Sequence, residues 1–228
     1  IIKINSEILK TDIKKITLIA CGTSAFACRI ARFWFEEFAN ITVNVDIASE
    51  FRYRDPILQK NGLTIVISQS GETADTLAAM RFAKENGQYT MALVNVNSSS
   101  MAREADSVLE TYAGPEIGVA STKAFTTQLM SMACFTLALA ESKHSISDEE
   151  PAQLSYSLSQ MSSRMVDIFH HDKAIADLSK ELIQASYIIY IGRGLTFPLA
   201  LEGALKLKEI TYIPAEANAA GELKHGPI

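Results

Sequence analysis

Short apolar runs alternate along the first 140 residues with longer segments in which apolar residues recur every three or four positions. The short runs are rich in β-branched residues, which is typical of buried strands, whereas the longer spacing is that of helices. Strands are predicted at residues 16–20, 41–47, 63–67, 89–94 and 108–112, and helices at residues 25–38, 73–86 and 124–140. Strands that alternate with helices in this way predict an α/β fold with a parallel five-stranded sheet flanked by helices.

The segment 68–73 (SQSGET) is a predicted turn between the strand at 63–67 and the helix that follows. It contains three hydroxyl side chains, an amide and a glycine. Its backbone N–H groups and the positive end of the helix dipole are expected to face one space, where a phosphate can bind. No lysine or arginine lies in the turn, so neutral donors would hold the anion. On the turn alone, the favoured alternative is that Ser70 or Thr73 only caps the helix.

A second turn, residues 21–24 (CGTS), follows the strand at 16–20. In parallel sheets, ligands bind beyond the carboxyl ends of the strands, at the point where the strand order reverses. Both turns follow the carboxyl ends of predicted strands. The sequence therefore places a candidate ligand site at this edge of the sheet.

The polar segment 143–150, followed by Pro151, predicts a linker between a first domain, residues 1–146, and a second part, residues 147–228. Residues 1–15 are expected to be a lead-in helix or linker. Residues 151–183 are predicted to be helical, with a break near His170 and His171. Because adjacent histidines on a helix point apart, we expect this pair to lie on the surface rather than to bind a metal.

The strand at 187–192 and the helix at 199–210 repeat the opening of the first domain. Gly22 corresponds to Gly194 and Glu37 to Glu209, both 172 positions later, and residues 48–50 are taken to resemble residues 215–216. These matches predict a duplication. The second copy is expected to stop at the last residue, before any equivalent of the 63–73 segment. Residues 216–227 are expected to form a loop of small residues.

Three charged residues of the second part, Glu202, Lys206 and Glu209, lie on one face of the predicted helix. Their spacing alone indicates an exposed ion pair that contributes little. His225 lies in the predicted loop, where a lone histidine is more often incidental than catalytic. Moving a proton between two sugar carbons needs a carboxylate base, and opening a sugar ring needs a group that titrates near neutral pH. The residue types alone leave both interpretations open.

Composition and charge narrow the possible partners. The net charge of −5 and the pI near 5.4 argue against nucleic acid. The three cysteines are odd in number and lack metal-binding spacing, which favours a reducing, cytoplasmic compartment. No run is long enough to span a membrane, and Phe197 stands where a dinucleotide fingerprint needs its third glycine. We therefore expect no membrane segment, no metal and no cofactor.

Six stretches closely resemble the isomerase half of the glutamine–fructose-6-phosphate aminotransferase family: CGTSA (21–25), ASEFRYR (48–54), SQSGETADTL (68–77), EIGVASTKAFTTQL (116–129), ALEGALKLKEI (200–210) and AGELKHGP (220–227). The resemblance runs from about residue 16 to the last residue. It implies the flavodoxin-like sugar isomerase (SIS) fold, with the start of a duplicated second SIS domain.

The resemblance also implies which residues bind the substrate. The sugar phosphate would be held by Ser68, Gln69, Ser70 and Thr73. The sugar or its phosphate would contact Thr23 and Ser24, and the sugar hydroxyls and amine would be held by Ser121 and by the backbone of Val119.

Three further residues are implied to act on the bound sugar. Glu209 would be the base that moves a proton between C1 and C2, and Lys206 would assist near that centre. His225 would open the sugar ring, and in this family it reaches the site from a neighbouring subunit. The resemblance therefore implies a homodimer at least.

The reaction implied by the resemblance converts fructose 6-phosphate and glutamine-derived ammonia to glucosamine 6-phosphate. The family's glutaminase domain and the tail lysine that forms a Schiff base are not in the sequence, and Cys21 is not the glutaminase nucleophile. We therefore expect a sugar-binding fragment of a member of this aminotransferase family. The alternatives are another SIS enzyme, such as a phosphosugar isomerase or aminosugar-phosphate deaminase, and a non-enzymatic phosphosugar sensor, which would not need Glu209 and His225.

Overall fold

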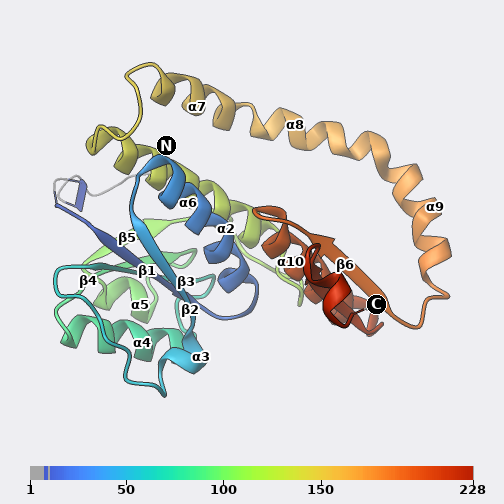
Figure 1. The fold of residues 1–228 in the computed structure, drawn as a ribbon, viewed down its shortest axis with the longest axis horizontal. Helices are drawn as coiled ribbons and strands as arrows, with labels where there is room; N and C mark the ends of the chain where they lie inside the picture. Colours follow the sequence, from blue (N-terminus) through green and yellow to red (C-terminus); the bar gives the residue numbers. More distant parts are fainter. Residues whose placement is uncertain (1–7, 10, 228) are drawn as a thin grey trace. The chain divides into compact units, whose positions relative to one another are not determined.

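The computed structural model of the chain describes residues 8–9 and 11–227 (Figure 1). Residues 1–7 and 10 of the predicted lead-in segment therefore lie outside the described residues. The chain divides into two compact units, Ile1–Ile146 and Ser147–Ile228, and each is described by itself. Among the described residues, no helix combines the length and apolar character needed to cross a bilayer.

The first unit is built on a parallel five-stranded sheet, as predicted. The strands are β1 (Lys15–Ala20), β2 (Thr42–Ile47), β3 (Leu63–Ser68), β4 (Tyr89–Val94) and β5 (Ser107–Glu110). Their order is β2-β1-β3-β4-β5, and each pair of neighbours is parallel. This is the flavodoxin-like order, in which the direction of chain travel reverses between β1 and β3. The carboxyl ends of these two strands are therefore where a ligand site is expected.

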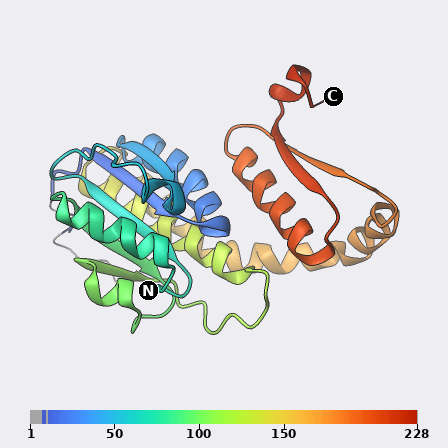
Figure 2. The same ribbon diagram turned by 90° about the horizontal axis from the view of Figure 1, so that it is seen from below.

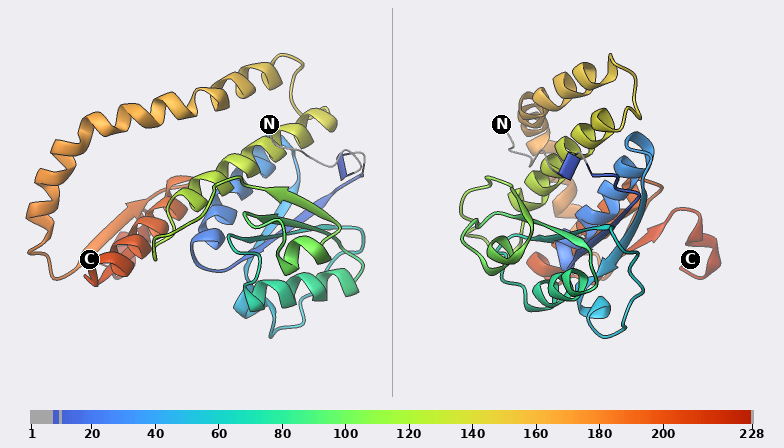
Figure 3. Two further views of the ribbon diagram at one scale, coloured as in Figure 1. Left: turned by 180° about the vertical axis from the view of Figure 1, so that it is seen from behind. Right: turned by 90° about the vertical axis from the view of Figure 1, so that its left-hand side faces the viewer.

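Helices cover both faces of this sheet (Figure 3). The helices α2 (Gly22–Phe38) and α6 (Lys123–Ser142) lie on one face, and α3 (Ala48–Phe51), α4 (Ala74–Glu85) and α5 (Ser100–Glu104) lie on the other. Alternate residues of β3 serve the two faces, since Ile65 and Ile67 pack in the α2–α6 cluster and Val66 packs with α3 and α4. All six residues of β3 are buried, which explains why this strand reads as a continuous apolar run.

The helices α2 and α6 also pack directly against each other. The rings of Phe35 and Phe135 meet edge to face, with their centroids 5.9 Å apart, and both side chains are fully buried. Such aromatic pairs add specific geometry to the burial of apolar area. This packing fixes the two helices relative to each other and to β1.

The second unit begins with a series of helices, α7 (Glu150–Ser159), α8 (Met161–Ile168), the 3₁₀ turn η1 (Phe169–His171) and α9 (Asp172–Leu182). The predicted break at the histidines is confirmed by η1, and both histidines are exposed, as expected. A further break lies at Gln160. The chain continues through β6 (Ile188–Gly192), α10 (Thr196–Thr211), β7 (Ala215–Ala219) and the 3₁₀ turn η2 (Glu222–His225). Figure 2 shows α10 against the two strands, which pair in parallel.

The succession β6–α10–β7 repeats β1–α2–β2, which supports the predicted duplication. Gly22, the first residue of α2, and Gly194, just before α10, both have positive φ, at 52° and 54°. Asn40, two residues after α2, and Tyr212, directly after α10, both lie in the left-handed region, at φ 50° and 60°. Each pair is separated by 172 positions. Non-glycine residues seldom adopt positive φ. The match between Asn40 and Tyr212 therefore indicates that the two copies share the same backbone geometry.

Two expectations for the end of the chain are wrong. Residues 215–219 form a strand paired with β6 and are not part of a loop. Their sequence, AEANA, has low strand propensity, but pairing with β6 and packing against α10 override it. The segment that corresponds to residues 48–50 (ASE) is 220–222 (AGE), at the same shift of 172, and not 215–216.

Candidate functional site

A polar cavity of about 180 Å³ lies at the carboxyl ends of β1 and β3, at the reversal of strand order. Seven of the eleven predicted site residues line it. The full lining is Cys21, Thr23, Ser24, Ile67, Ser68, Gln69, Ser70, Thr73 and Ser121. None of these residues is a lysine or an arginine, so an anion would be held by neutral donors, as predicted for the turn.

The turn between β3 and α4 is held by its own hydroxyl groups. The Ser68 Oγ accepts a hydrogen bond from the N–H of Gly71 at 3.0 Å and lies 2.9 Å from the Thr73 hydroxyl. The Ser70 Oγ accepts from the N–H of Glu72 at 3.2 Å. Two of the turn's N–H groups are therefore used within the turn. This differs from the expectation that the backbone N–H groups of the turn face a ligand together.

The helix-cap interpretation of this turn is wrong. Thr73 occupies the N-cap position of α4, but its side chain makes no capping hydrogen bond. The bond of Ser70 goes to Glu72, which precedes the helix. The N–H groups of the first turn of α4 have no partner within the helix, and they carry the positive end of its dipole. The hydroxyl of Thr73 and these N–H groups are thus available to an anion.

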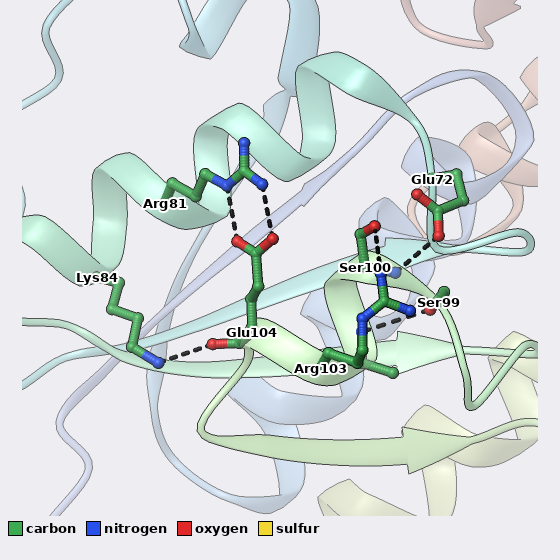
Figure 4. Close-up of polar contacts among 8 residues, drawn as sticks. Glu72, Arg81, Lys84, Ser99, Ser100, Arg103 and Glu104 are labelled. Carbon is green, nitrogen blue, oxygen red and sulfur yellow. Dashed lines mark hydrogen bonds and ion pairs between the residues drawn. The ribbon is translucent and has the colours of Figure 1, made fainter.

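The outer side of the turn is tied to α5 (Figure 4). The carboxylate of Glu72 accepts a hydrogen bond from the N–H of Ser100 at 2.7 Å, and the bonds from Ser100 hold the pKa of Glu72 below its usual value. Arg103 donates to the Ser100 Oγ, and Arg81 of α4 makes two hydrogen bonds of 2.6 and 2.7 Å with Glu104 of α5. Glu72 is not a lining residue of the cavity. Its negative charge is therefore used to hold the turn instead of opposing an anion.

Thr23 and Ser24 lie in the first turn of α2 and not in a loop, because this helix begins three residues earlier than predicted. The Ser24 Oγ accepts a hydrogen bond of 3.0 Å from the side-chain amide of Gln128 on α6. The sequence did not indicate Gln128 as a functional residue. The signal that could have indicated it is the polar amide of Gln128 among the apolar residues of the helix predicted at 124–140.

The loop before α6 brings Ser121 to the cavity. The carboxylate of Glu116 accepts hydrogen bonds of 3.1 Å from the N–H groups of Thr122 and Ala124 at the start of α6, where a negative charge is favourable. Val119 is fully exposed and does not line the cavity. The contact predicted for its backbone stays a prediction.

In the second unit, Lys206 lies between two carboxylates of α10. Its Nζ is 2.5 Å from the Glu209 Oε2 and 3.7 Å from the Glu202 Oε1. The side chain of Lys206 is only 18% exposed and that of Glu202 only 7%. The expectation of an exposed pair is therefore wrong for Glu202 and Lys206, which are largely removed from solvent, whereas Glu209 is exposed, as expected. His225 lies exposed in η2. Within the described part of the chain, no group of three His, Cys, Asp or Glu side chains is arranged to hold a metal ion.

The cysteines provide a direct test of occupancy of the cavity. Cys21 lines it, Cys134 is half-buried elsewhere, and burial raises the pKa of both Cys28 and Cys134. We expect inorganic phosphate, the anion probe for this cavity, at ten times its dissociation constant to slow alkylation of Cys21 about tenfold, because only the empty form reacts. The rate at Cys134 should not change. Peptide mass spectrometry after timed N-ethylmaleimide labelling measures both, and equal rates at Cys21 with and without ligand would contradict a ligand in this cavity.

Comparison with known proteins places this chain in a family. The SIS domain model matches residues 11–138 and 181–228. The glutamine–fructose-6-phosphate aminotransferase [isomerizing] of Bradyrhizobium diazoefficiens is 54% identical over 217 residues, which are 95% of this chain and 36% of that protein. The C-terminal domain of glucosamine-fructose-6-phosphate aminotransferase from Francisella tularensis superposes with a TM-score of 0.95 and 46% identity, over 97% of this chain and 63% of that structure.

The fold is shared more widely than the sequence. The glucosamine-6-phosphate deaminase of Thermotoga maritima superposes with a TM-score of 0.77 over 96% of this chain and 65% of that structure. At 24% identity, this likeness concerns the fold alone. The chain spans little more than a third of the Bradyrhizobium relative's length. Since the family model matches most of the chain, and matches both the unit that holds the cavity and the unit that holds Lys206 and Glu209, the chain belongs to the SIS domain family.

Proposed function

We propose that this chain is the sugar-phosphate isomerase portion of a glutamine–fructose-6-phosphate aminotransferase. The observation that carries the proposal is the hydroxyl-lined cavity at the carboxyl ends of β1 and β3. Identities of 54% and 46% to aminotransferases, over nearly the whole chain, support the same assignment. In the proposed reaction, fructose 6-phosphate and ammonia released from glutamine yield glucosamine 6-phosphate and water.

The first unit binds the phosphate of the sugar. Ser70, Thr73 and the N–H groups of the first turn of α4 donate to the phosphate oxygens, and Ser68 orients Thr73 through their hydrogen bond. Gln69, Thr23 and Ser24 complete the polar wall, with Ser121 on the side of the sugar hydroxyls. The cavity is smaller than the pockets that take drug-sized ligands, which suits a small sugar phosphate.

The second unit supplies the groups that transfer protons. Glu209 takes a proton from C1 of the sugar and delivers one to C2, which a carboxylate held near the substrate can do as a general base and then as an acid. Lys206, 2.5 Å from the Glu209 Oε2, orients this carboxylate. His225 opens the sugar ring in the site of a neighbouring subunit, so the active form is a homodimer at least.

Glutamine hydrolysis is assigned to no residue of this chain. A glutaminase domain elsewhere in a longer protein would supply the ammonia, and a lysine elsewhere in it would form the Schiff base with fructose 6-phosphate. The free thiols of all three cysteines support the expectation of a reducing, cytoplasmic compartment. The buried Lys206–Glu202 contact and its link to Glu209 favour an enzyme over a phosphosugar sensor.

Titration calorimetry with fructose 6-phosphate tests the phosphate site. The variant Ser70→Ala/Thr73→Ala removes two hydroxyl donors from the cavity. A hydrogen bond to a charged group contributes about 1.5–3 kcal/mol, so the double variant should bind about a hundredfold more weakly or worse. Thermal unfolding of the same sample shows whether the turn still folds.

A matched control is Ser159→Ala/Ser163→Ala, which removes two exposed hydroxyls from α7 and α8. Its affinity should equal that of the unsubstituted chain. Equal affinity of the cavity variant and this control would contradict the proposed phosphate site and require the anion to bind elsewhere.

A further inference from the structure

Gln128 is a buried amide that faces the cavity wall from behind. It lies on α6, is 2% exposed, and its Nε2 donates to the Ser24 Oγ at 3.0 Å. Its Oε1 is also buried and has no hydrogen-bond partner among the described residues. Gln128 is not itself a lining residue, whereas Ser24 is. Gln128 therefore acts on the cavity only through the hydroxyl of Ser24.

We propose that Gln128 is a positioning residue that makes Ser24 a hydrogen-bond donor to the phosphate of the ligand. This rests on the function proposed above. An amide NH₂ group can only donate, so the Ser24 Oγ accepts from it and its own proton is left to point elsewhere. The cavity lining contains no lysine or arginine, so each hydroxyl that donates its proton to a bound anion contributes to the affinity. Had the Ser24 proton been used in a bond to an acceptor behind it, only oxygen lone pairs would face the phosphate.

The duplicated segment shows what this hydroxyl does without such a partner. Thr196 corresponds to Ser24, 172 positions later. Its Oγ1 donates to the carbonyl of Arg193 at 2.9 Å and accepts from the N–H of Arg193 at 3.0 Å. In the second copy the hydroxyl of Thr196 thus makes both of its hydrogen bonds within its own turn. In the first copy the bond comes from another helix, and it leaves the proton of Ser24 for a ligand.

The buried Oε1 indicates that the amide is not retained for stability. A buried acceptor without a partner is unfavourable, and replacing it with an apolar group of similar shape removes its desolvation cost. Methionine has nearly the length and flexibility of glutamine. We therefore expect Gln128→Met to leave the midpoint of thermal unfolding unchanged or to raise it, while ligand binding becomes weaker.

A double-mutant cycle on the full chain tests the proposal, with calorimetry of fructose 6-phosphate binding. Gln128→Met and Ser24→Ala should each weaken binding about tenfold, since Ser24→Ala removes the donor to the charged group and Gln128→Met removes the bond that aims that donor. The variant with both changes should bind no more weakly than Ser24→Ala, because the two residues act as one unit. If the effects of the two changes add, so that the variant with both binds about a hundredfold more weakly, the proposal that Gln128 acts through Ser24 is overturned.

Two further variants separate positioning from packing. Gln128→Glu keeps the shape but presents an acceptor to Ser24, so binding at neutral pH should fall further than in Gln128→Met. Thr136→Val, a buried hydroxyl on the same helix that donates to the carbonyl of Met132 at 2.8 Å, should leave the affinity unchanged. Equal affinities of Gln128→Met, Gln128→Glu and the unsubstituted chain would overturn this inference alone if Ser70→Ala/Thr73→Ala still weakens binding. If that variant also binds normally, the proposed function falls with it.

Discussion

Replacing Gly71 with alanine is expected to lower the free energy of unfolding by about 3 kcal/mol or more and to abolish binding in the cavity. Gly71 has a φ of +67°, which costs a residue with a Cβ about 1–2 kcal/mol. The added Cβ would also lie 2.5 Å from the Cβ of Ser99, on the neighbouring α5 segment, and would overlap its Oγ. Overpacking of this kind costs typically a further 1–3 kcal/mol. Denaturant unfolding and calorimetry measure the two effects.

Gly87→Ala is the matched control for this substitution. Its φ of +74° carries the same conformational penalty, but a Cβ at this position would meet no atom within 4 Å. We expect a loss of about 1 kcal/mol and unchanged ligand affinity. Equal destabilisation by the two alanines would show that contact between the turn and Ser99 does not hold the site, contrary to the structure.

Glu209→Gln is expected to reduce the rate of glucosamine 6-phosphate formation about 10²–10⁴-fold, the usual contribution of a positioned acid or base. The amide keeps the shape of the side chain but cannot accept the C1 proton. Because Glu209 is proposed to act on the sugar carbons and not on the phosphate, the affinity for fructose 6-phosphate should change little. On the proposed function, the measurement is turnover by an aminotransferase that contains this chain together with a glutaminase domain, with calorimetry for the affinity.

The duplication provides the control for Glu209. Glu37 occupies the corresponding place on α2, 172 positions earlier, and is exposed. Glu37→Gln should leave both turnover and affinity unchanged, since within the described part of the chain only Glu209 of this pair lies against a lysine. A fall in turnover as large as that of Glu209→Gln would contradict the assignment of the base.

The strands and helices of the first unit were predictable because their signals are local. A strand buried on both faces needs a continuous β-branched run, and residues 63–67 have one. The ends of the helices were predicted less accurately than their existence. The helix α2 begins at Gly22, so Thr23 and Ser24 belong to the helix and not to the turn before it. The strand β7 was missed because its alanines and asparagine lack strand propensity, and only pairing with β6 makes them a strand.

The candidate site was predictable in part for the same reason. The hydroxyls, amide and glycine of residues 68–73 follow a strand and precede a helix, so sequence placed them at the carboxyl edge of the sheet. Whether Thr73 caps α4 was not decidable, because capping and ligand binding use the same residue type. The structure decides it by pairing Thr73 with Ser68 and leaving α4 without a side-chain cap.

The sequence by itself determined the alternation of strands and helices, the duplication at a shift of 172 and the polar character of both turns. These follow from periodicity and residue type, which act between near neighbours. The tertiary structure alone decided that Gln128 supports Ser24, across 104 residues, and that Glu202 is buried beside a half-buried Lys206. Contacts between distant segments depend on how helices pack on the sheet, and no local pattern records that packing.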